Sequence, residues 1–165
     1  ELGALLHDIA DAKFHGGDEE IGPKTATDFL KLMDVDRTVI EHIDKIIRNI
    51  SFKNSFDKKS FNSLEMEIIQ DADRLDAIGA IGIARTFNYG GFKGSEIYNP
   101  DIEPMEFKSK EDYKKSNGPT INHFYEKLLL LKDKMNTKKG KEIADKRHKY
   151  MLDYLEQFYL EWEGN

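Results

Sequence analysis

Apolar residues recur at intervals of three and four along almost the whole chain, and no segment alternates apolar and polar residues in the manner of a strand. Spacing of this kind places apolar side chains on one face of an α-helix. With 165 residues, 39% of them hydrophobic, the chain is long enough to bury a core behind such faces. We therefore predict an all-α protein that forms a single domain over residues 1–165.

Glycine, proline or polar segments separate the expected helices. The helices cover residues 2–14, 20–33, 37–50, 63–88, 121–135 and 143–162. Asp36 is the expected N-cap of the third helix, because a carboxylate can accept a hydrogen bond from the first free backbone N–H groups. In the second helix, we expect Phe29, Leu30 and Met33 to be buried.

Two long segments are predicted as loops. Residues 51–63 are polar and basic, and residues from about 89 to 119 contain three of the four prolines. Loops of about 30 residues in a compact domain are usually functional or disordered. We expect the second loop to border the functional site or to be mobile.

Composition limits the chemistry. The chain has no cysteine, which excludes disulfides, thiolate metal sites and a cysteine nucleophile, so any metal must be held by imidazole and carboxylate groups. No apolar run approaches the length of about 20 residues that a membrane span needs, and no signal peptide is visible. These features predict a cytoplasmic protein without membrane contact, and a homodimer is left open.

Charge is distributed unevenly. Residues 1–36 hold nine acidic residues and three lysines and so carry the whole net charge of −6. This acidic opening suits a cation and disfavours nucleic acid, although a solvated acidic surface is an equal interpretation. The basic residues of 132–149 are interpreted as a solvated helix face, because no aromatic residues or readable motif make them a nucleic-acid site.

The first expected helix carries a polar cluster. His7, Asp8 and Asp11 share one face, whereas the leucine and isoleucine side chains between residues 2 and 9 lie on the opposite face. A wet polar face of an amphipathic helix explains this pattern. A ligand set is the alternative, favoured by small Gly3 and Ala4 beside the cluster, which would let a second helix approach closely.

A second candidate lies in the long expected helix. Asp73 falls in an apolar stripe that runs from Met66 to Phe87, and Asp76 lies on nearly the same side. A buried carboxylate is stable only if it is paired or bound to a metal. The alternatives are therefore a divalent cation and an ion pair with a lysine or arginine elsewhere.

Together, His7, Asp8 and Asp73 form a nitrogen and oxygen ligand set that suits Mn, Fe, Ni, Zn or Mg. A divalent ion held there would lower the pKa of a bound water and polarise a phosphoryl oxygen. Asp11, which follows His7 by one helical turn, is the candidate general acid or base.

These motifs resemble the HD-domain metal-dependent phosphohydrolases. The resemblance is carried by the His7-Asp8 pair after Ala4-Leu5-Leu6, by Asp11, and by the run from Asp71 to Asp76. Carried over by position, His7, Asp8 and Asp73 match the second, third and fourth metal ligands of that family. The family's first histidine lies upstream of the His-Asp pair, so the resemblance implies an HD-domain helical bundle that lacks its N-terminal helix and this ligand in the present chain.

The resemblance extends to a bacterial subgroup, the YpgQ-type nucleoside triphosphate pyrophosphohydrolases. Residues 5–14, 70–89, 120–135 and 147–162 carry it. It implies hydrolysis of (d)NTPs to monophosphate and pyrophosphate. Other phosphoesters, such as (p)ppGpp, a cyclic nucleotide or a nucleoside monophosphate, are alternatives within the same chemistry. A degenerate HD domain that serves as a helical nucleotide-binding or interaction module is the alternative from another class.

A phosphorylated substrate needs charge neutralisation beyond one metal ion. The weak candidates for substrate contacts are Lys13, Arg74, Asp76, Arg85, Lys127 and Arg147. Each arginine or lysine among them has an ordinary surface or helix-pairing role as its alternative. His42 and His123 are interpreted as structural histidines, and a role at the functional site is the alternative for each.

Overall fold

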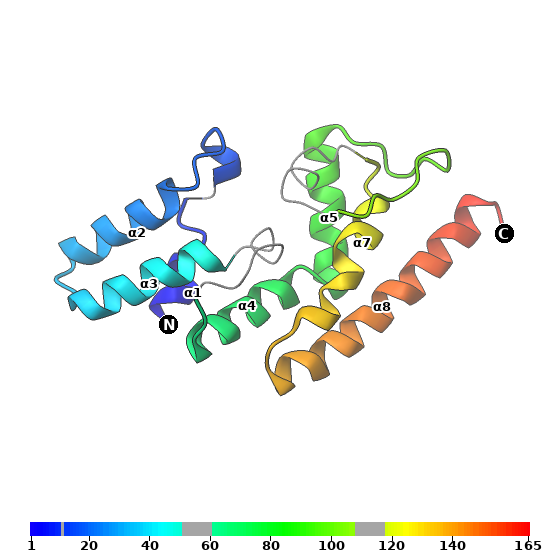
Figure 1. Cartoon of the computed structure of the whole chain (residues 1–165). Coiled ribbons are helices and arrows are strands. Elements are labelled where there is room, and N and C mark those ends of the chain that lie inside the picture. Colours follow the sequence, from blue (N-terminus) through cyan, green and yellow to red (C-terminus); the bar gives the residue numbers. More distant parts are fainter. Residues whose placement is uncertain (11, 51–60, 108–117) are drawn as a thin grey trace. The chain divides into compact units, whose positions relative to one another are not determined.

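The structure is a computed structural model, and it describes residues 1–10, 12–50, 61–107 and 118–165. Every regular element in the described part is helical (Figure 1), which confirms the predicted all-α class. None of the described helices is both long and apolar enough to cross a membrane.

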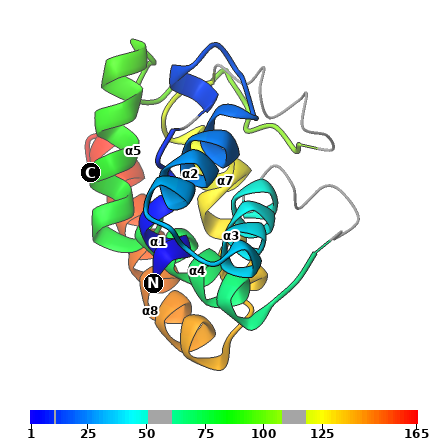
Figure 2. The same cartoon turned by 90° about the vertical axis from the view of Figure 1, so that its left-hand side faces the viewer.

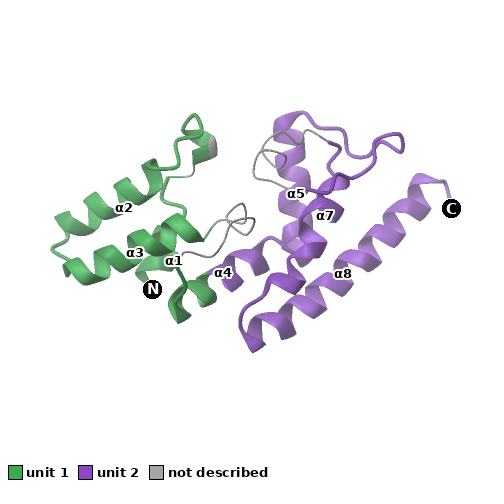
Figure 3. Cartoon of the chain, viewed as in Figure 1, with its two compact units in different colours: residues 1–69 green, residues 70–165 purple. Residues whose placement is uncertain are grey.

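Contacts divide the chain into two compact units, residues 1–69 and residues 70–165 (Figure 3). The division falls inside one helix, α4 (Leu64–Asp76), between Ile69 and Gln70. The single domain over residues 1–165 stays a prediction.

Unit 1 is built around a pair of helices. In chain order it contains α1 (Leu2–Leu6), η1 (Ala12–Phe14), α2 (Ile21–Leu32), α3 (Arg37–Asn49) and the start of α4. Helices α2 and α3 lie alongside each other (Figures 1 and 2), and α1 packs on α3. Helix α1 ends at Leu6 and does not continue to residue 14 as predicted, because the Ile9 N–H bonds to the Leu6 carbonyl in a tighter turn.

The core of unit 1 follows the predicted spacing in α3. Its buried residues are Leu6, Ala26, Leu30, Ile40, Ile43, Ile46, Ile47, Ile50, Met66 and Ile69. The Asp36 carboxylate accepts a hydrogen bond from the Thr38 N–H at 2.8 Å, which confirms the N-cap, and the bonds from Thr38 lower the pKa of Asp36. The prediction that Phe29 and Met33 are buried is wrong: both are exposed, since Leu30 alone of the three faces α3.

Unit 2 contains the rest of α4, two long helices and several short turns. They are α5 (Gly79–Lys93), α7 (Asn122–Glu126), η3 (Leu128–Leu130), η4 (Lys132–Lys134) and α8 (Lys138–Trp162). The predicted helix 121–135 is therefore three short elements, because the Lys127 backbone leaves the helical region at φ −144°. Helix α8 begins earlier than expected, with Thr137 as its N-cap.

The predicted helix 63–88 is interrupted. Ile78 is extended and Gly79 has φ +76°, so α4 ends at Asp76 and α5 starts in a new direction. A Cβ atom on Gly79 would lie 2.9 Å from Cγ of Arg147, whose guanidinium donates a hydrogen bond to the Leu75 carbonyl. The packing of α8 against this junction therefore requires glycine there. Helix α5 continues past the predicted end to Lys93, where Gly94 forms a left-handed cap.

The core of unit 2 is rich in aromatic residues. The rings of Phe87, Phe124 and Tyr154 contact one another with centroids 6.0 to 6.1 Å apart. Phe124 is completely buried, and so is Ile121 next to the start of α7. Helices α5 and α8 pack together. The expectation that Tyr150 and Leu152 lie on the buried side of the C-terminal helix is wrong, because both are exposed, whereas Met151 and Leu155 are buried.

Candidate metal centre

His7 lies at the C-terminal end of α1. Its Nδ1 donates a hydrogen bond to the Ala4 carbonyl at 2.9 Å, and its Nε2 lies 3.5 Å from Oδ2 of Asp8. A bond of this kind from Nδ1 to a backbone carbonyl fixes the tautomer and leaves the lone pair on Nε2, as in metal-ligating histidines. The imidazole is therefore oriented by its own helix.

Gly3 brings α4 close to this helix. A Cβ atom on Gly3 would lie only 2.7 Å from Cδ1 of Ile69, so the approach depends on the missing side chain. This confirms the prediction that a small residue beside the cluster allows a second helix to approach. Because Asp73 follows Ile69 by four residues in α4, it lies on the same face of that helix one turn further on.

His7, Asp8 and Asp73 each offer a ligand atom, and these atoms all lie within 4.8 Å of one another. Ligands on opposite sides of a divalent ion are about 4.2 Å apart, so small side-chain rotations are enough for a shared ion. One imidazole and two carboxylates also match the ligand preferences of a transition-metal ion or Mg²⁺. In the part of the chain that the structure describes, no other set of three such residues meets this criterion.

The sequence predicted that Asp73 is a buried carboxylate, and the structure differs. Asp73 is exposed, whereas Asp71 is the buried carboxylate of α4, with 3% of its surface accessible. The prediction that Asp73 interrupts a buried seam is therefore wrong. Asp8 is exposed as well, so the three ligand atoms lie where a dissolved molecule can reach them.

The catalytic candidate Asp11 lies outside the described residues. The substrate contact proposed for Lys13 also falls there in part, because only the backbone of this residue, in η1, is described. Both roles stay predictions.

Two candidate substrate contacts already have internal partners. The guanidinium of Arg74 donates to the Lys134 carbonyl and lies 3.9 Å from Asp71, and burial lowers its pKa. Arg147 donates to the Leu75 carbonyl at the junction of α4 and α5. Binding a phosphate with either residue would require these backbone hydrogen bonds to break.

The other candidates are more accessible. Arg85 forms an ion pair of 3.0 Å with Asp76, and both side chains are more than half exposed. Lys127 lies near His123: burial, and next the charge of Lys127, lower the pKa of His123 to about 4. His123 is therefore neutral at physiological pH, in agreement with a structural histidine.

Comparison with known proteins identifies the family of the chain. The HD-domain family matches residues 1–78, which include α1 and α4. YpgQ of Bacillus subtilis is 35% identical over 99% of this chain and 72% of its own length. Protein L803 of Acanthamoeba polyphaga mimivirus is 31% identical over 58% of this chain and 46% of its own length.

Solved structures give the same result. A Lactobacillus plantarum protein is 41% identical with a TM-score of 0.83, covering 99% of this chain and 74% of its own. An HD-superfamily hydrolase of Bacillus thuringiensis is 44% identical with a TM-score of 0.71, covering 99% and 73%. YpgQ in complex with ADP is 32% identical with a TM-score of 0.72, covering 98% and 75%.

The chain therefore belongs to the HD-domain superfamily of metal-dependent phosphohydrolases, as the sequence resemblance predicted. Within that superfamily, its relatives of the YpgQ type match it over almost its whole length.

Proposed function

We propose that this chain hydrolyses nucleotides with a divalent cation held by His7, Asp8 and Asp73, and that its substrates are (d)NTPs, cleaved to monophosphate and pyrophosphate. The convergence of the three ligand atoms within 4.8 Å carries this proposal. The structure of YpgQ in complex with ADP supports a nucleotide as the substrate class. Exposure of Asp8 and Asp73 supports access from solvent.

The residues of the chain have distinct parts in this proposal. When bound, the ion supplies Lewis acidity, which activates water and neutralises phosphoryl oxygens. The hydrogen bond to the Ala4 carbonyl holds the His7 ring so that Nε2 stays directed toward Asp8. The carboxylates of Asp8 and Asp73 bring negative charge, which favours a cation over any neutral ligand.

Proton transfer is assigned to Asp11. This residue follows His7 by four positions and Asp8 by three. In the proposed reaction, its carboxylate takes a proton from the attacking water and returns one to the leaving phosphate oxygen.

Among the candidate phosphate contacts, we propose Arg85 first. Its surface ion pair with Asp76 is worth at most about 1 kcal/mol, so a phosphate can replace Asp76 at little cost. Lys13 and Lys127 are proposed next, and Arg74 and Arg147 last, because the last two donate to backbone carbonyls.

The test is a panel of NTPs, dNTPs, nucleoside monophosphates, cyclic nucleotides and (p)ppGpp, assayed with Mn²⁺, Mg²⁺, Ni²⁺, Zn²⁺ and Fe²⁺. Pyrophosphate and orthophosphate are quantified separately, and bound metal is measured on the same preparation. Pyrophosphate release from triphosphates supports the full proposal. Orthophosphate from a nucleoside monophosphate, pyrophosphate from (p)ppGpp, or a nucleoside monophosphate from a cyclic nucleotide, identified by chromatography, would change the assigned substrate but still show a hydrolase. A preparation that binds nucleotide yet hydrolyses nothing with any of the ions would instead indicate a degenerate binding module.

A further inference from the structure

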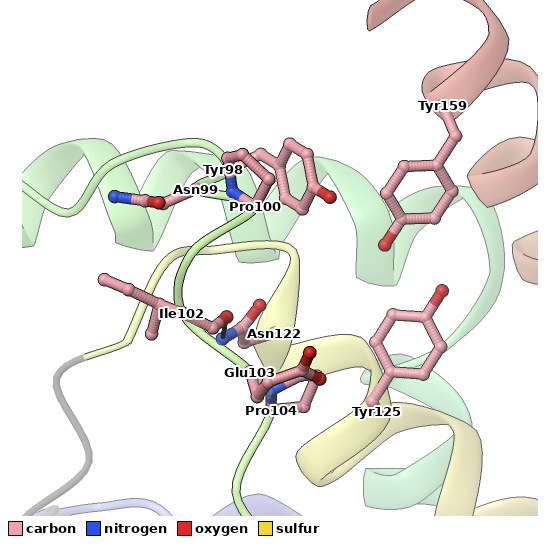
Figure 4. A pocket seen from close by; sticks show the side chains of 9 residues that line it. All are labelled: Tyr98, Asn99, Pro100, Ile102, Glu103, Pro104, Asn122, Tyr125 and Tyr159. Carbon is pink, nitrogen blue, oxygen red and sulfur yellow. Dashed lines mark hydrogen bonds between the residues drawn. The ribbon is translucent and has the colours of Figure 1, made fainter. Parts of the chain in front are cut away.

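A pocket lies in unit 2, formed by the segment after α5 together with α7 and α8 (Figure 4). It encloses about 340 Å³. Three tyrosines from three different elements point toward one another around it: Tyr98, Tyr125 and Tyr159. Asn99, Pro100, Ile102, Glu103, Pro104 and Asn122 complete its lining. None of these residues belongs to the candidate metal centre.

One wall of this tyrosine pocket is fixed by buried polar side chains of α7. Asn122 Nδ2 donates to the Ile102 carbonyl at 2.8 Å, and Glu126 Oε1 accepts the Met105 N–H at 3.1 Å. Both Asn122 and Glu126 are buried. The segment from Asn99 to Met105 is therefore held in place without a ligand, which reduces the entropy lost on binding.

The opposite wall consists of aromatic rings. Tyr98 packs edge to face on Tyr159, with centroids 5.4 Å apart, and on Trp162 at 5.1 Å. Burial, and next a hydrogen bond with the Tyr125 hydroxyl, raise the pKa of Tyr159. The phenol of Tyr159 therefore stays neutral. The pocket is lined by the rings of three tyrosines, and the face of such a ring attracts cations.

Acidic residues predominate in the described segments beside the pocket. Glu103 is the one charged residue among the described residues of its lining. The segment 96–107 has four acidic residues and no lysine or arginine, and the chain after Lys149 likewise has acidic residues but no basic ones. The pocket also lies near the C-terminal end of α8, where the helix dipole favours positive charge.

We propose that this pocket binds a small organic ammonium ion, held by the faces of Tyr98, Tyr125 and Tyr159 and by the carboxylate of Glu103. The described residues of the lining include no lysine or arginine that could neutralise a phosphate, which favours a cation over the nucleotide here. A cation interacts favourably with both the rings and the carboxylate, whereas a neutral aromatic ligand would interact favourably with the rings alone.

The molecule contains a built-in reporter for this test. Trp162 is the one tryptophan of the chain, and it contacts Tyr98. Choline is titrated while Trp162 fluorescence is recorded, with EDTA present so that the metal centre has no influence. The neutral isostere 3,3-dimethylbutan-1-ol is titrated in parallel, and adenosine tests for stacking of a nucleobase.

We expect saturable binding of choline that is at least about fivefold tighter than that of the neutral isostere. Glu103→Gln and Tyr125→Leu should each weaken choline about three- to tenfold. Tyr125→Phe should keep the affinity, because it keeps the ring. Tyr150→Leu is the matched control, since Tyr150 is an exposed tyrosine of α8 outside the lining, and it should change nothing.

Three results would overturn the proposal. They are an isostere that binds as tightly as choline, adenosine that binds more tightly than choline, and an absence of saturable choline binding by the wild-type protein. Circular dichroism melting of each variant separates lost binding from lost folding, and Tyr125→Phe provides a folded variant if Tyr125→Leu is unstable.

Discussion

The carboxylate of Asp71 accepts two hydrogen bonds from Thr137, one from its backbone N–H and one from its hydroxyl, both at 2.7 Å. Thr137 is the N-cap of α8, and its Oγ1 accepts the Gly140 N–H at 2.9 Å. The N–H of Asn136 donates to the same carboxylate at 2.8 Å. A buried negative charge in α4 therefore lies at the positive end of the longest helix of unit 2.

Asp71→Ala should lower the free energy of unfolding by about 3 kcal/mol or more, because it leaves several buried donors without their charged acceptor. Urea denaturation measures the change. Asp153→Ala is the control: Asp153 forms only an exposed ion pair with Lys149, worth about 1 kcal/mol or less. Equal losses in the two variants would contradict a special role for Asp71.

The close approach of α1 and α4 predicts a coupling between Gly3 and Ile69. Gly3→Ala should destabilise the protein by about 1 kcal/mol, because the new Cβ meets Cδ1 of Ile69 at 2.7 Å. Ile69→Val removes the clashing atom and should itself cost about 0.5–1.5 kcal/mol. The double variant should be more stable than the sum of the two changes, and strict additivity in this double-mutant cycle would argue against the contact.

A helical glycine without neighbours provides the reference for that cycle. Gly91 lies in α5, and a Cβ atom there would meet nothing within 4 Å. Gly91→Ala should therefore stabilise the protein by about 0.5–1 kcal/mol through helix propensity alone. A destabilised Gly91→Ala variant would show that propensity is not separable from packing in this chain.

The junction between α4 and α5 makes a different prediction. Gly79 and Gly94 both have positive φ, +76° and +67°, but only Gly79 lies against another side chain, that of Arg147. Gly94→Ala should cost about 1–2 kcal/mol for the left-handed conformation. Gly79→Ala should cost about 1–3 kcal/mol more, because its Cβ would also overlap Arg147. Thermal unfolding of the two variants gives this difference directly, and equal losses would exclude the packing contribution.

Burial of His123 predicts a dependence of stability on pH. Its pKa in the folded state is about 4, below the ordinary value of 6.5. Between these values the unfolded state binds more protons, so stability is fully present above pH 6.5 and is lost as pH falls toward 4. The loss attributable to His123 is about 3 kcal/mol.

Urea denaturation at pH 7 and pH 5 measures the part of this loss that falls between these two pH values, about 2 kcal/mol. His123→Asn cannot take up the proton, so the decrease between the two pH values should be smaller in this variant than in the wild type. Burial also lowers the pKa of His148. In His123→Asn, His148 should therefore still make the free energy of unfolding fall as the pH falls. If the free energy of unfolding of His123→Asn decreases between pH 7 and pH 5 as much as that of the wild type, His123 is not the source of the pH dependence.

Local signals in the sequence predicted much of the fold. The isoleucines of α3 recur at helical spacing, and Asp36 caps that helix, so both its face and its start were readable. The break at Gly79 was not readable, because it depends on Arg147 in α8, more than 60 residues away in the sequence. The spacing of apolar residues alone favours a continuous helix there.

The candidate metal centre shows the same limit. The pattern around His7 and the spacing of Asp73 were visible in the sequence, and the resemblance to HD-domain proteins connected them. Which carboxylate of α4 is buried was not visible, because it depends on Asn136 and Thr137 folding back over Asp71. Periodicity identifies a face of a helix, but the partner that covers the face decides burial.

The proposed metal ligand Asp73 gives the most direct test of the site. Asp73→Asn removes one negative oxygen from the cluster of three ligands, while its exposed position keeps the cost to folding small. We expect metal affinity to fall at least about tenfold and hydrolysis at least about a hundredfold, since a lost ligand impairs both binding and activation. Asp153→Asn makes the same chemical change on the exposed surface of α8 and should retain wild-type metal content and rate. Calorimetric metal titration and the nucleotide assay are run on both variants. If Asp73→Asn binds the ion as tightly as the wild type, the assignment of Asp73 as a ligand is wrong, whatever the activity of the protein.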